Sequence, residues 1–172
     1  MLSTARARFW WLAVNLLTTF LHVMVISSFE KSIEKIVLLA ALMPIVASMG
    51  GNAGTQTLTV AVRAIATTEL TSANAWRMVG KEIAVGLVNG LLFAVIMGLI
   101  VYFWYHNARL GAVIAGAMIV NLVAAGFSGA VIPMALNRVG FDPAHSGAVF
   151  LTTVTDVVGL FAFLGLATWF LL

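Results

Sequence analysis

The 172-residue sequence contains no cysteine and carries little charge. Without cysteine, a disulfide framework, a thiolate metal site and a cysteine nucleophile are all excluded. Only 9% of the residues are charged, whereas 62% are hydrophobic, and a water-soluble domain of this size needs far more charge on its exterior. The sequence therefore predicts a protein whose solvent is the lipid bilayer.

Basic residues are too few and too scattered for binding to nucleic acid. The net charge is only +3, and no basic cluster is interleaved with aromatic residues in the way that phosphate backbones require. No Ser/His/Asp set and no pair of metal ligands is spaced for hydrolysis either. We therefore expect neither a nucleic-acid partner nor an enzyme.

Long runs without charge predict transmembrane helices. Hydrocarbon offers the backbone no hydrogen-bond partners, which favours helices, and each helix needs roughly 20 apolar residues to cross the bilayer. The runs predict an all-α integral membrane protein with five transmembrane helices in a single domain over residues 1–172. The predicted spans are residues 9–28, 36–62, 83–105, 110–136 and 146–172.

Two stretches depart from a simple apolar pattern. Pro44 and a glycine-rich run are expected to interrupt the second span, and the polar residues 63–82 are expected to form a loop with a short interfacial helix. With the N-terminus in the cytoplasm, the inner side collects six of the nine basic residues, which satisfies the positive-inside rule. We therefore expect a multi-pass protein of the inner cell membrane. The six are Arg6, Arg8, Arg63, Arg77, Lys81 and Arg138, and the three outside are Lys31, Lys35 and Arg109.

Asp156 lies near the middle of the fifth predicted span. A carboxylate at that depth costs at least ~2.5–3.5 kcal/mol, so it usually faces a partner or a water-filled path. One alternative is an Asp that is protonated or satisfied by neighbouring hydroxyl groups. Helical spacing favours the wall of a pore, because small and polar residues share its face. These residues are Ala148, Thr152, Thr155 and Gly159.

The second span also has a polar face. Its members are Ser48, Gly51, Asn52, Thr55 and Thr59, with Gln56 beside them. Ordinary helix packing is one interpretation, since Gly50 and Gly54 form a small-xxx-small pair. A pore wall is the other, because so polar a run at bilayer depth is tolerated mainly where it meets protein or water.

Motifs in these two spans resemble the MgtE family of magnesium channels. Residues 44–57 (PIVASMGGNAGTQT), followed by residues 62–64 (VRA), are similar to the second transmembrane helix of that family. Residues 142–144 (DPA) and 152–159 (TTVTDVVG) are similar to its last helix. The motifs have the right order and spacing, and the resemblance covers essentially the whole chain.

The resemblance implies a homodimer in which the second and fifth helices line the pore and Asp156 is the central cation site. It also implies that Mg2+ is transported, with Mn2+, Co2+, Zn2+ or Ca2+ as alternatives. The family typically adds a cytoplasmic helical domain and paired CBS modules before the membrane region. The 172 residues leave no room for these, so we expect any regulatory module to lie on a separate chain, to have been removed from a longer protein, or to be absent.

The chemistry of Mg2+ agrees with this hypothesis. Mg2+ keeps most of its water and is usually held through one or two carboxylates, and a two-fold axis along the pore would bring Asp156 opposite its own copy. Asp142 is a candidate for a cytoplasmic-side site, although a role in the loop with Arg138 is the preferred interpretation. His22 is expected to be a neutral packing residue rather than a ligand.

Two other functions fit the same residues. A proton-coupled carrier of a cation or small solute would use Asp156 as its protonation site. A non-transporting scaffold would need Asp156 only for packing.

Overall fold

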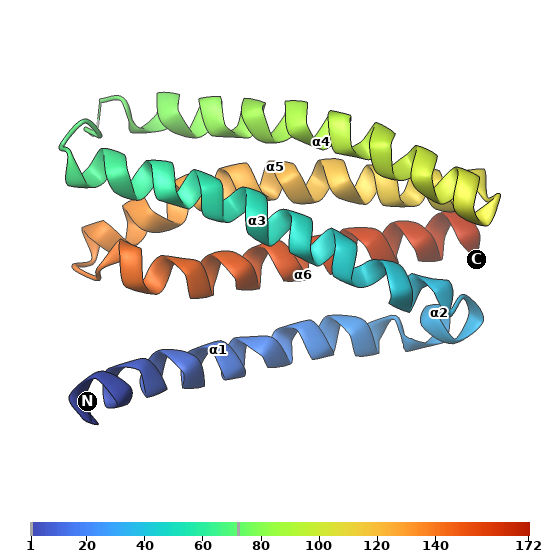
Figure 1. Ribbon diagram of the computed structural model, residues 1–172, viewed down its shortest axis with the longest axis horizontal. Helices are drawn as coiled ribbons and strands as arrows, with labels where there is room; N and C mark the ends of the chain where they lie inside the picture. The colour runs from blue at the N-terminus through green and yellow to red at the C-terminus, as the bar shows by residue number, and fades with distance from the viewer. Residues whose placement is uncertain (1, 72) are drawn as a thin grey trace.

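The computed structural model describes residues 2–71 and 73–172, with side chains described from residue 9 onward except at 145 (Figure 1). The described chain is helical, with short connections and no strand, which confirms the predicted all-α class. Its helices are α1 (Leu2–Ser28), α2 (Glu30–Lys35), α3 (Leu38–Ala66), α4 (Ala75–Tyr105), α5 (Ala108–Arg138) and α6 (Pro143–Leu171).

Within the described residues, five of the helices are long and apolar enough to cross a bilayer, as predicted. The structure differs from the prediction at the start of α4, because residues 75–82 belong to this helix and not to a loop. Val79 and Glu82 of this segment are buried and continue the packing face of α4, whereas Arg77 and Lys81 point outward. Long basic side chains near the end of a transmembrane helix can extend so that their charged groups reach the water at the membrane surface.

α3 continues without a break through Pro44 and the glycine-rich run, where the sequence predicts an interruption. Proline removes one hydrogen bond of a helix, but neighbouring helices can compensate for that loss in a membrane protein. Leu39, Leu42 and Val46 form one buried face before and after Pro44. Packing along this face stabilises α3 as one continuous helix through Pro44.

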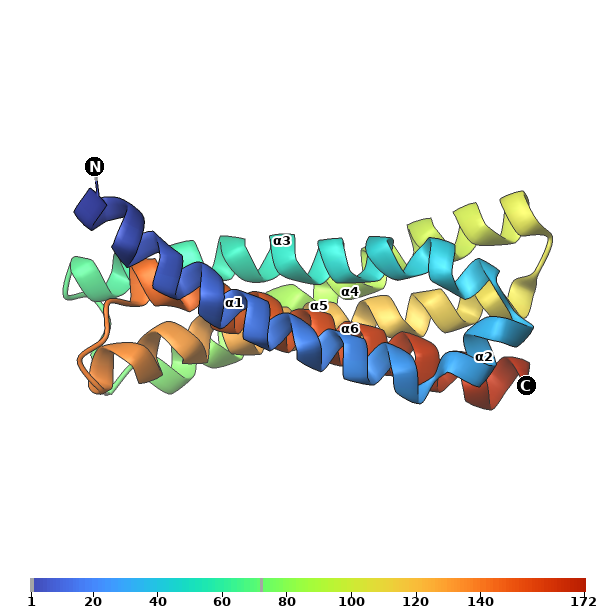
Figure 2. The same ribbon diagram turned by 90° about the horizontal axis from the view of Figure 1, so that it is seen from below.

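α5 is the central helix, with α3, α4 and α6 packed around it (Figure 1). Its residues Leu110, Ile114, Met118 and Leu122 are almost wholly buried. α1 lies on the outside, crosses α6 (Figure 2) and packs mainly against that helix. Among residues 9–28, no described side chain is fully buried.

The connections divide between the two ends of the bundle. The N-terminus and the α3–α4 and α5–α6 connections lie at one end, and α2, the α4–α5 connection and the C-terminus lie at the other (Figures 1 and 2). The six basic residues expected in the cytoplasm belong to segments near the first end, and the other three to segments at the second. This grouping agrees with the sequence analysis, while the side of the membrane that each end faces stays a prediction.

Candidate cation site

Asp156 lies beside a histidine from the far end of the sequence. Its side chain is 25% exposed, and its Oδ2 atom lies 3.8 Å from Nε2 of His22 on α1. Nε2 of His22 is buried and has no hydrogen-bond partner among the described residues. From the sequence, His22 is expected to be a packing residue, because no pattern in the chain relates the first span to the last.

The predicted stripe on α6 divides into two faces. Ala148 is exposed, and Thr152 and Asp156 are partly exposed one helical turn apart. Thr155 is fully buried, and Gly159 packs so closely on Asn121 of α5 that a Cβ atom would overlap its side chain. The structure therefore does not bring Thr155 and Gly159 to the exposed face. The sequence could not predict this, because a helical wheel shows which residues share a face of the helix but not which face packs against the bundle.

The polar face of α3 lies uncovered in the protomer. Ser48, Asn52, Thr55, Gln56 and Thr59 are all exposed, and Gly51 is partly exposed. The hydroxyl groups of Thr55 and Thr59 donate to carbonyl oxygens of the preceding turn, each at 2.8 Å. A hydroxyl hydrogen that is bonded within its own helix leaves only oxygen lone pairs facing outward. Along α3 these groups can accept hydrogen bonds from water or contact a cation.

Close contacts set Asp156 level with this polar face. α3 and α6 run in opposite directions (Figure 1), Gly54 packs against Leu151, and Gly147 packs against Leu58. Continuing this register along both helices places Asp156 level with residues 48–52 of α3. The carboxylate and the amide and hydroxyl groups of α3 thus occupy the same depth in the bundle.

Comparison with known proteins identifies the family. The family model MgtE, described as a divalent cation transporter, matches residues 43–166. The chain belongs to the MgtE family. It is 33% identical over 170 residues to the magnesium transporter MgtE of Enterococcus faecalis, covering 99% of this chain and 38% of that protein. It is also 33% identical over 161 residues to the magnesium transporter MgtE of Thermus thermophilus, covering 94% of this chain and 36% of that protein.

A third relative, the magnesium transporter MgtE of Bacillus subtilis, is 32% identical over 161 residues, with 94% of this chain and 36% of that protein covered. The chain thus spans little more than a third of the length of these curated relatives. MgtE proteins are transporters and not enzymes, in agreement with the sequence analysis.

The fold buries one carboxylate, Glu82, that the sequence predicts to lie in a loop. Glu82 of α4 is only 8% exposed, and Thr57 of α3 donates a hydrogen bond of 3.0 Å to its Oε2 atom. A cleft of about 330 Å³ beside it is also lined by Gln56, Lys81 and Asn89. Spacing offers a signal for this residue, since Glu82 precedes Gly86 and Gly90 at four-residue intervals and so shares their packing face.

Asp142 acts in the structure as the N-cap of α6. Its Oδ1 atom accepts a hydrogen bond of 2.9 Å from the backbone N–H of Ala144, and such a cap satisfies one of the free donors at a helix start. The side chain is exposed at the end of the bundle. The contact is therefore structural, but it is made to the backbone of Ala144, and no ion pair between Asp142 and Arg138 is present among the described residues.

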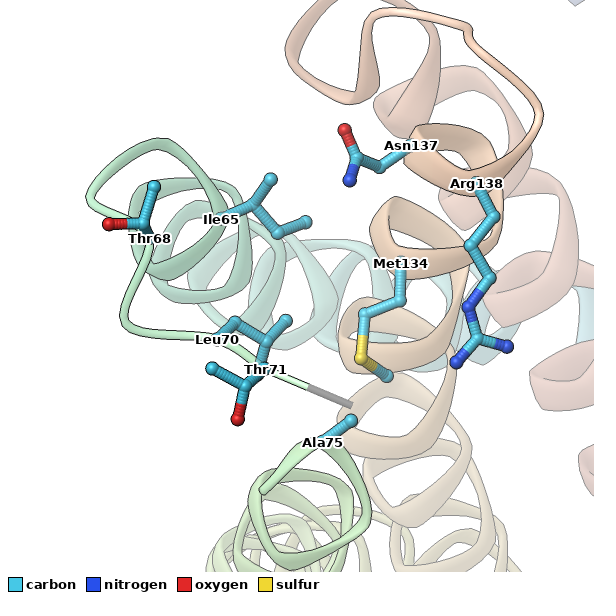
Figure 3. A pocket seen from close by; sticks show the side chains of 8 residues that line it. All are labelled: Ile65, Thr68, Leu70, Thr71, Ala75, Met134, Asn137 and Arg138. Atoms are coloured by element: carbon cyan, nitrogen blue, oxygen red, sulfur yellow. The ribbon is translucent and has the colours of Figure 1, made fainter. Parts of the chain in front are cut away.

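A separate pocket of about 240 Å³ opens at the same end of the bundle, between the α3–α4 connection and the last turns of α5 (Figure 3). Met134, Asn137 and Arg138 border it on the α5 side. Its described lining includes no carboxylate, so it differs in this respect from the surroundings of Asp156. The residues that line it are Ile65, Thr68, Leu70, Thr71, Ala75, Met134, Asn137 and Arg138.

Proposed function

We propose that the chain forms the ion-conducting part of a divalent-cation transporter and that Mg2+ is its principal cargo. Family membership and the names of the relatives support this proposal. The observation that supports it most is Asp156, a partly exposed carboxylate inside a transmembrane helix, level with an uncovered row of amide and hydroxyl groups. Such a surface is costly against lipid but suits a hydrated cation.

We further propose that two copies of the chain form the pore. Within the described residues of one protomer, no three His, Asp or Glu side chains gather at a point where they could hold a metal ion. A two-fold axis would supply Asp156 twice, and two carboxylates with several retained waters match the coordination of Mg2+. The uncovered polar face of α3 would then border water and the partner rather than lipid.

In this arrangement the pore wall consists of exposed residues from α3 and α6. Thr155 and Gly159 serve it indirectly, since they pack α6 on α5 and so fix the position of Asp156. The direct wall residues are Ser48, Gly51, Asn52, Thr55, Gln56, Thr59, Ala148, Thr152 and Asp156. The end of the bundle that carries six basic residues faces the cytoplasm.

Mg2+ flux into proteoliposomes tests the proposal. We expect Asp156→Asn to abolish uptake while the dimer still elutes at the wild-type position in size-exclusion chromatography. Glu69→Gln is the matched control, because Glu69 is an exposed carboxylate in the α3–α4 connection, and it should transport like the wild type. Near-normal flux through Asp156→Asn would rule out Asp156 as the central site.

The contact between His22 and Asp156 also favours a second candidate, a proton-coupled carrier, because chains of His and carboxylate residues form proton relays in membranes. The same vesicles distinguish the two functions when a pH gradient is imposed. Uptake indifferent to the gradient supports a passive cation path, whereas uptake that needs the gradient supports the carrier.

A further inference from the structure

The buried imidazole nitrogen beside Asp156 is unexplained by Mg2+ transport. Mg2+ prefers oxygen ligands and keeps much of its water, so it has little use for nitrogen. Nε2 of His22 nevertheless points at the carboxylate and has no hydrogen-bond partner in the described structure. Buried polar atoms without a partner are rare and costly, which calls for a ligand at this place.

The distance between the two side chains fits a metal ion better than a hydrogen bond. At 3.8 Å, Nε2 and Oδ2 lie beyond hydrogen-bonding range. In the tetrahedral geometry of zinc, a zinc–nitrogen bond of about 2.0–2.1 Å and a zinc–oxygen bond of about 2.0–2.2 Å place the two ligand atoms about 3.4 Å apart. An approach of about 0.4 Å from the observed 3.8 Å would therefore let both atoms bind one ion directly.

The donor set indicates which class of ion it would be. One imidazole nitrogen and one carboxylate oxygen suit a borderline transition metal such as Zn2+, Co2+ or Ni2+. No third His, Asp or Glu side chain joins them among the described residues of the protomer. Water or the same pair from a second copy completes the coordination, and two such pairs would give the four ligands typical of zinc.

We propose that His22 and Asp156 form a transition-metal site on the ion path, at which Zn2+ binds by direct coordination and blocks the passage of Mg2+. This inference rests on the proposed function, since it takes Asp156 to lie in the pore. The same carboxylate would hold Mg2+ through water and Zn2+ through a metal–oxygen bond. His22 then raises the affinity of the site for Zn2+ without contributing to the binding of Mg2+.

The binding test uses the purified chain in detergent, with Zn2+ titrated by calorimetry and Co2+ followed by its visible absorption. We expect His22→Gln to lower the Zn2+ affinity by at least about tenfold, a loss already typical when a residue that merely supports a metal ligand is changed. The matched control is His106→Gln, because His106 is an exposed histidine that follows α4. This control should bind Zn2+ like the wild type.

A second variant distinguishes the loss of a metal ligand in His22→Gln from a folding defect. The chain has no cysteine, so His22→Cys places a single thiol next to Asp156. Thiolate is a strong zinc ligand, and we expect this variant to recover tight Zn2+ binding. Unchanged Zn2+ affinity in His22→Gln, or failure of the wild type to bind Zn2+ at all, would overturn the inference.

Transport separates this inference from the proposal on which it rests. In proteoliposomes, Zn2+ should inhibit Mg2+ uptake by the wild type and by His106→Gln, and several times more Zn2+ should be needed with His22→Gln. Normal Mg2+ uptake by Asp156→Asn would refute the proposed function and with it the block of the ion path, whereas Zn2+ binding by His22 and Asp156 would stand on the calorimetric result. Equal inhibition of the wild type and His22→Gln would refute only the role of His22.

Discussion

Asn121 joins three helices at a single buried point. Its side chain is fully buried in α5, its Nδ2 atom donates a hydrogen bond of 2.7 Å to the carbonyl of Val46 in α3, and Gly159 of α6 contacts it from the other side. A hydrogen bond from a side chain to another helix is one of the main adhesive contacts available in lipid. The position of the two proposed pore helices thus depends on this residue.

Asn121 and Gly50 should behave as a coupled pair. A Cβ atom at Gly50 would overlap the Asn121 side chain, so Gly50→Ala should lower the free energy of unfolding. Asn121→Ala should also lower it, by about 1–2 kcal/mol, through loss of the hydrogen bond. In the double variant the new methyl group enters the vacated space, and the combined loss should be smaller than the sum.

Unfolding in mixed detergent and dodecyl sulfate, followed by circular dichroism, measures these three variants. If the loss in the double variant equals the sum of the two single losses, Gly50 and Asn121 are not in contact as the structure shows.

Single site residues can be predicted from the sequence when they differ in charge or polarity from the residues next to them in the chain. Asp156 is such a residue, because a charge in an apolar run is visible without knowledge of the fold. His22 and Glu82 were missed as site residues, since their partners Asp156 and Thr57 lie on other helices. Thr155 was assigned to the pore stripe because residues of one helix can be grouped by periodicity, while their direction depends on neighbours that periodicity does not reveal.

Small residues let helices α4 and α5 approach until their backbones touch. A Cβ atom at Gly86 would overlap the carbonyl oxygen of Leu122, and one at Gly126 would overlap the carbonyl oxygen of Glu82. Gly98 and Gly111 meet in the same way near the other end of the pair. Where helices associate in lipid, such close packing replaces the hydrophobic effect as the main driving force.

Gly86→Ala should therefore separate α4 from α5. We expect the free energy of unfolding to fall by about 1–3 kcal/mol, as for other substitutions that overfill a packed interior. Gly80→Ala is the matched control on the same helix, because a Cβ atom there would meet nothing within 4 Å. The control should be neutral or slightly stabilising, since alanine is the better helix former.

The same unfolding assay reads both glycine variants. A loss of stability in Gly80→Ala equal to that in Gly86→Ala would show that the position of the glycine on the helix has no importance.

The elements themselves were largely predictable from length and hydropathy, because each span must match the bilayer. The start of α4 was not, since Arg77 and Lys81 look like loop residues until their outward direction is known. The course of α3 through Pro44 was not either. Its continuity depends on packing of Leu39, Leu42 and Val46 against other helices, which a proline seen in sequence does not reveal.

The molecule has two very different outer faces. The outer side of α4 is apolar, with exposed residues such as Leu87, Leu92 and Val95, and this face suits lipid. The exposed side of α3 is polar, as at Asn52 and Thr55, and this face is costly in lipid. Seen as a whole, these two faces agree with the proposed arrangement, in which α3 borders water and a partner and α4 faces the bilayer.

Cross-linking in native membranes tests this division. We expect Thr55→Cys to yield a covalent dimer with a short bifunctional thiol reagent, because the proposed two-fold axis brings the two copies of α3 near each other. Leu92→Cys on α4 should stay monomeric under the same conditions. Since the chain has no cysteine of its own, each variant reports on one position only, and dimers formed through Leu92→Cys alone would place the interface on α4.

The peripheral position of α1 has a consequence for how the protein is made. Of the six described helices, α1 leaves the ribosome first, and its main packing partner, α6, leaves it last. Contacts between such distant segments form late, because the intervening chain must be ordered first. α1 therefore has to remain in the membrane without its main packing partner while α2 to α5 are synthesised, and the contact between His22 and Asp156 can form only after α6 has been made. Assembly of the proposed metal-binding pair is thereby tied to the synthesis of α6.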